Sequence, residues 1–414
     1  MNEGLPPYMP RLVDRILPET LAGLPAVWLT GARGAGKTTT ARRYAVSTAQ
    51  LNRPGDNASF IADPDEALSR MPEPTLLDEW QDVPSVLGAV KRAVDLDPRS
   101  GRFLLTGSVR GEVMDTWPAT GRVVKVPVFP LTRRELSGRA DGDLFVDRAT
   151  TPNPDLFPPA EPASVFDYVG WAAEGGLPDA VLHRSGRQRR QWLRTYLDQL
   201  VTTDARLAGG KPDRRRFATY TEALAINSAG VVDEVTLQDA ARISRVTAHS
   251  YQDLLEALFF CEQVPAWWSD RLTRLTALPK RYLIDTSLMA VLLRADEATM
   301  AKDANLLGRI LDTFVAMQLR PELAVAAAEP QMYHLRTKAG EHEVDLLLEY
   351  PDRTVVGIEI KATAGPSLSD AKHLVWLRER LGDRFLSGFV LHTGPHTFRL
   401  SEKIIAAPIS TIWQ

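Results

Sequence analysis

The sequence predicts an α/β protein that begins with a mostly parallel sheet and has helices on both faces of that sheet. Three observations support this fold class. Over residues 10–137, short apolar runs alternate with helical stretches, the pattern of strands joined by crossover helices. A glycine-rich segment lies between the first apolar run and the next helix. Near the C-terminus, two apolar runs separated by a turn predict a second sheet.

The elements of the first sheet follow from apolar runs of strand length. Strands are expected at 26–29, 59–62, 75–79, 102–105 and 123–126. Helices are expected at 39–45 and 84–94, the second with Pro84 near its start.

Residues 31–38 match the phosphate-binding loop pattern G-x-x-x-x-G-K-[ST] at each fixed position. In such a loop the glycines let backbone N–H groups turn inward around phosphates, at the positive end of the following helix. Lys37 is expected to reach the β- and γ-phosphates, and the Thr38 hydroxyl to bind Mg²⁺. The predicted nucleotide-binding residues are Gly31, Ala32, Arg33, Gly34, Ala35, Gly36, Lys37, Thr38 and Thr39.

Two acidic residues end the predicted strand at 75–79. Asp78 is expected to support Mg²⁺, directly or through water, and Glu79 to polarise the attacking water. Alone, such a pair is also explained by capping of the next helix, but its position after a phosphate-binding loop favours nucleotide hydrolysis. On the next strand, Thr106 or Ser108 is expected to lie between the two acidic positions and to sense the γ-phosphate.

Composition indicates a globular protein in a reducing compartment. The 414 residues are 44% hydrophobic and 24% charged, enough for several folded domains. The net charge of −3 argues against a uniformly basic surface. The single cysteine, Cys261, excludes internal disulfides and cysteine-rich zinc sites. The N-terminus lacks signal-peptide features and no apolar run approaches about 20 residues, so we expect a cytoplasmic protein without membrane contact.

Changes in composition along the chain divide it into five expected segments. Several prolines close together suggest a linker. The stretch after it has a helical residue pattern, which suggests a small helical lid on the first domain. The expected boundaries are 10–137 for a P-loop core, 138–165 for a proline-rich linker, 166–210 for a helical lid, 215–295 for a winged-helix-like domain and 300–414 for a small α/β domain.

The winged-helix prediction rests on a helix at 236–242, a tight turn, a helix at 247–258 and two strands at 264–268 and 281–285. The residues expected to point outward from the second helix carry little positive charge. We therefore favour docking of a protein partner over DNA reading for this domain, and keep both.

The last domain carries a second group of charged residues. Strands at 344–350 and 354–361 meet at the turn 351–353. A three-residue loop places Asp345 opposite Glu359, and Lys361 shares that face. Two carboxylates and a lysine can hold Mg²⁺ and activate water beside a phosphodiester. A solvated polar face is the alternative, which the strongly apolar neighbours disfavour.

Taken together, the chain resembles a prokaryotic family that joins an AAA-type P-loop ATPase domain to a C-terminal domain of unknown function. The resemblance rests on 31–38, 77–81, 105–108, 121–122, 130–136 and 279–285. Glu343-Val344-Asp345 with Glu359-Ile360-Lys361 is similar to the PD-(D/E)XK nuclease core, where Asp312 stands in place of the usual, longer glutamate.

The resemblance implies ATP as the nucleotide. It also implies that Arg122, with Arg110 as the rival, presents a guanidinium to the γ-phosphate from the same or a neighbouring subunit, and so a homo-oligomer. The resulting prediction is an Mg²⁺-dependent ATPase that couples hydrolysis to DNA, RNA or a protein partner, with Lys37, Glu79, Thr106 and Arg122 as catalytic residues. The alternatives are a metal-dependent nuclease regulated by its ATPase domain and a signalling ATPase switch without nuclease activity.

Overall fold

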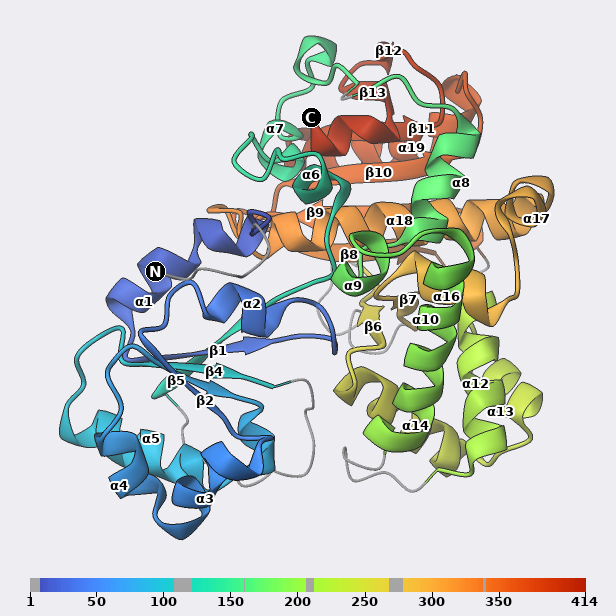
Figure 1. The fold of residues 1–414 in the computed structure, drawn as a ribbon. Helices are drawn as coiled ribbons and strands as arrows, with labels where there is room; N and C mark the ends of the chain where they lie inside the picture. Colours follow the sequence, from blue (N-terminus) through green and yellow to red (C-terminus); the bar gives the residue numbers. More distant parts are fainter. Residues whose placement is uncertain (1–7, 108–120, 160, 206–211, 268–277, 338–339) are drawn as a thin grey trace.

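The computed structural model describes residues 8–107, 121–159, 161–205, 212–267, 278–337 and 340–414. An N-terminal sheet with its helices, a largely helical middle and a C-terminal sheet lie against one another (Figure 1). Ser108 and Arg110 lie outside the described residues.

The first sheet has five strands in the order β2-β3-β4-β1-β5, and each neighbouring pair is parallel. Its strands are β1 (Ala26–Thr30), β2 (Ser47–Gln50), β3 (Thr75–Asp78), β4 (Phe103–Thr106) and β5 (Val123–Pro127). Separate apolar clusters cover the two faces. The prediction of a parallel sheet between two helical layers is therefore confirmed. Since parallel strands share one carboxyl edge, the segments that follow β1, β3 and β4 meet there.

One predicted strand is wrong. Residues 59–62 belong to the helix α3 (Pro54–Ala62), and β2 is the strand that precedes it. Phe60 is buried while Ile61 is 64% exposed, so the segment turns a single apolar side chain inward. Pro54 begins the helix, where its missing N–H costs nothing. The other helices of this part are α1 (Leu17–Gly23), α2 (Lys37–Ala41), α4 (Pro64–Ser69) and α5 (Val86–Leu96).

The segment 138–165, expected to be a proline-rich linker, contains a short helix and packs on the C-terminal part of the protein. It follows the short helix α6 (Arg133–Leu136) and contains α7 (Phe145–Arg148). Phe145 and Phe157 are fully buried and contact Phe389 edge to face, at ring distances of 5.2 and 4.8 Å. Figure 1 shows this segment beside the last sheet, far from the first.

The chain then forms the helical middle. Its helices are α8 (Val165–Glu174), α9 (Pro178–Val181), α10 (Gly186–Gln199), α12 (Arg214–Ile226), α13 (Glu234–Ala241), α14 (Arg245–Ala257), α16 (Thr286–Leu292) and α17 (Glu297–Lys302). Between α14 and α16, β6 (Cys261–Val264) pairs antiparallel with β7 (Lys280–Leu283). The predicted order of helix, turn, helix and two strands is present, and its assignment as a winged helix remains a prediction.

The C-terminal part places a six-stranded sheet against the long helix α18 (Ala304–Leu323) and the shorter α19 (Lys372–Leu381). The strands are β8 (Gln331–Arg336), β9 (Glu343–Glu349), β10 (Val355–Lys361), β11 (Phe385–His392), β12 (Phe398–Ser401) and β13 (Ile404–Pro408). The β9–β10 pairing runs from Glu349 opposite Val355 to Leu346 opposite Ile358. The three-residue hairpin loop is confirmed, and this register sets Asp345 opposite Glu359.

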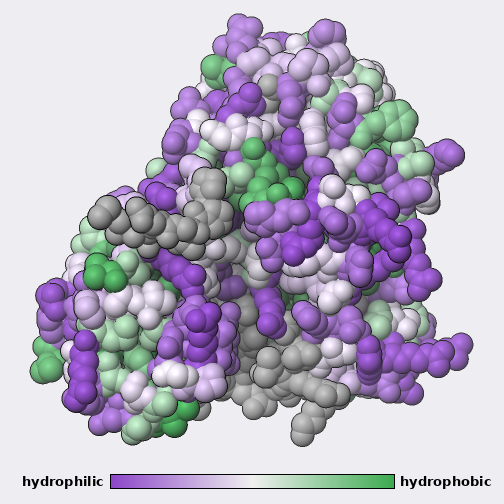
Figure 2. Space-filling view, viewed as in Figure 1, coloured by the Kyte–Doolittle hydropathy of each residue, from purple (hydrophilic) through white to green (hydrophobic). Residues whose placement is uncertain are grey.

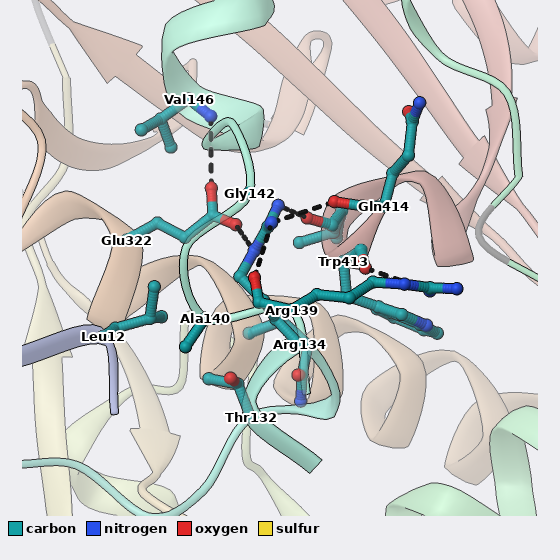
Figure 3. A network of polar contacts seen from close by, with 12 residues as sticks. Leu12, Thr132, Arg134, Arg139, Ala140, Gly142, Val146, Glu322, Trp413 and Gln414 are labelled. Carbon is teal, nitrogen blue, oxygen red and sulfur yellow. Dashed lines mark hydrogen bonds and ion pairs between the residues drawn. The ribbon is translucent and has the colours of Figure 1, made fainter. Parts of the chain in front are cut away.

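A buried ion pair fastens these parts together (Figure 3). Arg134 on α6 donates to Glu322 on α18 over 2.9 Å, and both side chains are about 1% exposed. Arg134 also donates to the carbonyls of Ile412 and Gln414 at 2.6 and 2.9 Å. The second carboxylate oxygen of Glu322 accepts the Val146 N–H at 3.2 Å. Three distant segments thus meet at one guanidinium.

We expect Glu322→Gln to lower the free energy of unfolding by about 3–5 kcal/mol, because it leaves the Arg134 charge buried without its counter-charge. Urea denaturation measures the change. Glu66→Gln, which removes an exposed pair with Arg70, is the control and is expected to cost less than about 1 kcal/mol. Equal effects of the two substitutions would contradict the fastening role of Glu322.

Candidate nucleotide-binding site

The phosphate-loop segment connects β1 to α2, and its glycines are required by the path of the backbone. Gly34 and Gly36 have φ of 74° and 96°, in the region that favours glycine. A Cβ at Gly31 would lie 2.1 Å from the carbonyl oxygen of Val128. The loop is therefore packed directly against the segment that follows β5, its neighbouring strand.

Lys37 lies inside the curve of this loop. Its side chain is 6% exposed, and Nζ donates to the carbonyls of Gly31 at 2.9 Å and Ala32 at 2.8 Å. Burial lowers the pKa of Lys37 to about 8, although the charges of Glu79 and Asp78 oppose this shift. The ammonium group is thus held at the start of the loop by two charge-assisted hydrogen bonds to backbone carbonyls.

Asp78, at the end of β3, joins the start of α2 to the end of β4. Its Oδ1 accepts hydrogen bonds from the hydroxyls of Thr38 at 2.7 Å and Thr106 at 2.5 Å. Arg42 places a guanidinium nitrogen 3.8 Å from Oδ2. The carboxylate is 5% exposed. A buried carboxylate beside a threonine hydroxyl supplies the oxygen ligands that Mg²⁺ takes, so these residues fit that ion.

Glu79 adopts a left-handed backbone conformation with φ of 55°, which is uncommon outside glycine. The amide of Gln81 donates to its Oε2. Glu79 is half-buried at the carboxyl edge of the sheet, immediately beyond Asp78. The backbone turn thus separates the carboxylates of Asp78 and Glu79. The side-chain amide of Gln81 positions the Glu79 carboxylate by a hydrogen bond.

The sequence analysis missed Arg11, whose side chain forms a hydrogen bond with the phosphate loop. Its 6%-exposed guanidinium donates to the Ala35 carbonyl at 3.0 Å, to the Phe129 carbonyl at 2.6 Å and to Glu135 at 2.9 Å. Glu135 also caps its own helix through Thr132. The Thr132-x-x-Glu135 pattern signals that cap in the sequence, but nothing in the sequence signals its partner Arg11.

The helical middle also reaches the loop. The Tyr196 hydroxyl on α10 donates to the Arg33 carbonyl at 3.1 Å, and Trp192 stacks on Tyr196. The predicted segment 166–210 therefore touches the phosphate loop through one helix, while α8 packs on α16, α17 and α18.

Arg122 is not at this site. The parallel register places Val123 beside Ala26, the first residue of β1, so Arg122 lies at the opposite edge of the sheet from the loop. There it donates to Asp95 on α5 at 2.8 Å. The prediction that Arg122 acts in its own subunit is corrected by this position. A role in a neighbouring subunit stays a prediction.

The second predicted group, in the C-terminal part, is brought together. Asp345 accepts the Ile360 N–H at 2.9 Å, and Lys361 donates to Glu359 at 2.8 Å. Glu359 is 2% exposed, and its Oε1 has no hydrogen-bond partner among the described residues. Burial and the charge of Asp345 raise the pKa of Glu359 to about 8.

A lysine that the sequence analysis did not assign to this group enters it from β7. Lys280 is 1% exposed, and its Nζ lies 3.1 Å from Asp312 Oδ2 and 3.3 Å from Asp345 Oδ1. Tyr282 donates to the other oxygen of Asp312 at 2.9 Å. Burial would raise the pKa of Asp345, but the charges of Lys280 and Lys361 outweigh burial and lower it.

The Lys280 ammonium therefore supplies the positive charge between these carboxylates. Within the described ranges, no three or more His, Cys, Asp or Glu side chains come together as a metal-binding group. Asp312, which stands in place of a longer glutamate, forms an ion pair with Lys280 and accepts a hydrogen bond from Tyr282.

Comparison with known protein families supports a P-loop ATPase assignment for the first part of the chain. Residues 24–137 match the AAA domain family, which supports ATP binding and ATPase activity. Residues 166–299 and 307–412 match two families described as domains of unknown function, DUF8612 and DUF4143. These matches leave the winged-helix and nuclease-like predictions unconfirmed.

Relatives cover nearly the whole chain. The uncharacterized proteins Mb2031c of Mycobacterium bovis and Rv2008c of Mycobacterium tuberculosis are each 27% identical over 394 residues, 94% of this chain and 81% of theirs. Among solved structures, the Walker-type ATPase PABY2304 of Pyrococcus abyssi matches at 14% identity and a TM-score of 0.41, covering 70% of this chain and 99% of that one. In the described part of the chain, no helix combines the length and apolar character needed to cross a membrane.

We expect Lys280→Met to destabilise the protein by about 3–5 kcal/mol, because it leaves the buried Asp312 carboxylate and the partly buried Asp345 carboxylate without their ammonium partner. Adding Asp312→Asn to that variant should recover part of the loss in urea denaturation. Lys302→Met, at an exposed position on α17, is the control and should change stability by less than about 0.5 kcal/mol. A Lys280→Met variant as stable as the wild type would contradict the ion-pair role.

Proposed function

We propose that this protein is an Mg²⁺-dependent ATPase whose hydrolysis cycle drives a change in a nucleic-acid or protein complex. The observation that carries the proposal is the Asp78 carboxylate, which receives the hydroxyls of both Thr38 and Thr106 beside a phosphate-binding loop. A loop lysine, a hydroxyl, a carboxylate and a following glutamate form the residue set that phosphoryl transfer requires.

Each residue has a distinct role in this proposal. Lys37 exchanges its two carbonyl contacts for phosphate oxygens when nucleotide binds. Thr38 and Asp78 hold Mg²⁺, which neutralises phosphate charge when bound. Glu79, held by Gln81, orients and polarises the attacking water. Thr106 keeps Asp78 in position and lies where it senses the γ-phosphate.

The contacts of the loop suggest how its state reaches the rest of the molecule. Arg11 links the Ala35 carbonyl to Glu135. Glu135 lies shortly before the segment 138–165, which packs on the C-terminal part. Tyr196 links the Arg33 carbonyl to α10. A loop that rearranges around phosphates changes both carbonyls, so nucleotide binding is transmitted to the helical middle and to the C-terminal part.

We expect Lys37→Ala to lose nucleotide binding in calorimetry, because it removes the ammonium that faces the phosphates. Glu79→Gln should bind ATP as the wild type does, while its hydrolysis falls at least about 100-fold, the usual size of a lost acid–base group. Glu379→Gln, at an exposed position on α19, serves as the matched control and should hydrolyse normally.

Unchanged affinity in Lys37→Ala would defeat the phosphate-loop assignment, and wild-type turnover in Glu79→Gln would remove the role of Glu79. Turnover measured with single-stranded DNA, duplex DNA and RNA separates a nucleic-acid machine from a signalling switch that answers to a protein partner.

A metal-dependent nuclease is the second candidate, and one observation favours it. Glu359 is buried with an unpartnered oxygen opposite Asp345 and beside Lys361, the arrangement expected of two metal-binding carboxylates and a lysine. Lys280 opposes this candidate, because it already neutralises Asp345. We therefore place the nuclease second.

Under the nuclease candidate, Mn²⁺-dependent cleavage of plasmid DNA should fall at least about 100-fold in Glu359→Ala. Glu349→Ala, at the far end of β9, is the control and should cleave normally. Cleavage that survives both Asp345→Ala and Glu359→Ala would come from a contaminant and would end this candidate.

A further inference from the structure

An arginine-lined groove lies between α10 and the α16–α17 turn, on the helical middle of the molecule. It has a volume of about 580 Å³ and an apolar floor that includes Leu193 and Ala290. Its walls carry Arg189, Arg190, Arg194 and Arg294. Figure 2 shows many strongly hydrophilic side chains on the right-hand side of the molecule, where Figure 1 places α16 and α17.

Three of these guanidinium groups have no hydrogen-bond or ion-pair partner among the described residues. Arg190, Arg194 and Arg294 are exposed, and they form neither a side-chain hydrogen bond nor an ion pair with any residue in the described ranges. Arg189 differs, because it is bound by Glu174 at 3.2 Å and by the Ala180 and Arg184 carbonyls. Arg189 therefore shapes the wall, and the other three present donors to the groove.

The acidic residues of the groove do not cancel this charge. Asp296 turns its carboxylate into the start of its own helix, accepting from the Thr299 N–H at 2.8 Å and hydroxyl at 2.6 Å. Glu297 is exposed at the rim. Four arginines thus face two carboxylates, and the lining keeps an excess of positive charge in a protein whose net charge is −3.

The position of the arginines is unfavourable for the helix alone. Gly186–Gln199 has no acidic residue in its first turn, and Ser185 makes no side-chain cap. Arg190 and Arg194, one turn apart on α10, repel each other. A bound anion would relieve this repulsion.

We propose that this groove binds the phosphodiester backbone of a single-stranded nucleic acid. Guanidinium groups pair with phosphate oxygens through two parallel hydrogen bonds. The apolar part of the lining, which includes Leu193 and Ala290, accommodates the apolar face of a base, while Arg190, Arg194 and Arg294 pair with phosphates of the strand.

The groove is also connected to the phosphate loop. Leu193 and Arg194 face the groove, and Tyr196, on the same helix, donates to the Arg33 carbonyl. A strand that displaces α10 therefore acts on the loop. This second step rests on the proposed ATPase function, whereas strand binding does not.

The test is binding of a labelled single-stranded oligonucleotide of mixed sequence, followed by fluorescence anisotropy without ATP. Arg190→Glu/Arg194→Glu should weaken binding at least about 10-fold. The slope of log K against log salt should fall by about 1.4, because each single-strand phosphate contact contributes about 0.7. Arg294→Glu alone should weaken binding in the same direction. Circular dichroism checks that the variants remain folded.

Two control variants make the same charge change elsewhere. Arg53→Glu/Arg380→Glu replaces exposed arginines on other elements and should bind as the wild type does. Arg242→Glu/Arg245→Glu changes the end of α13 and the start of α14, the rival site on the winged-helix-like segment. Lys37→Ala should keep oligonucleotide binding, which separates the groove from the ATPase proposal.

The proposal is wrong if the wild type fails to bind the oligonucleotide at low salt, or if Arg190→Glu/Arg194→Glu binds as tightly as the wild type. Loss confined to Arg242→Glu/Arg245→Glu would move the site to α14 and overturn it as well. Polyglutamate that displaces the strand as well as unlabelled oligonucleotide does would identify an acidic protein as the ligand instead.

Discussion

The structure depends on one carboxylate, that of Asp78, at the carboxyl edge of the first sheet. It accepts hydrogen bonds from two hydroxyls, that of Thr38 at the start of α2 and that of Thr106 at the end of β4, while it is almost completely buried. These bonds are available only because β3 and β4 are parallel neighbours and β1 lies next to β4. The order of the strands therefore determines the chemistry of the edge, and the phosphate loop lies where the resulting group of oxygen atoms can be used.

Much of this edge could be predicted from the sequence, because local patterns determine it. The glycine loop needs positive φ at Gly34 and Gly36, and strand ends bring Asp78 and Thr106 to it. The β9–β10 register followed from a three-residue turn, since side chains alternate along strands. These features depend on residues that are close in sequence or on the pairing of two consecutive strands. The pattern of residue types is therefore enough to predict them.

Other features could not be predicted, because they depend on contacts between distant segments. Arg11 meets Glu135 across 124 positions, and Lys280 meets Asp345 across 65. Residues 59–62 have the composition of a strand. In the structure they form the end of a helix that buries Phe60 and leaves Ile61 exposed. Arg122 is a different case: it directly precedes the expected strand 123–126, so the direction of that strand alone places it at the amino edge of a parallel sheet.

The path of the chain between residues 138 and 165 has a consequence for the way this protein is built. After the first sheet the backbone crosses to the last sheet, where Phe145 and Phe157 pack on Phe389, and only then forms the helical middle. The C-terminal domain is thus completed by residues encoded well before it. A fragment that begins at α8 would lack Phe145 and Phe157 and would leave the core around Phe389 incomplete, so the C-terminal part depends on the segment that links it to the first sheet.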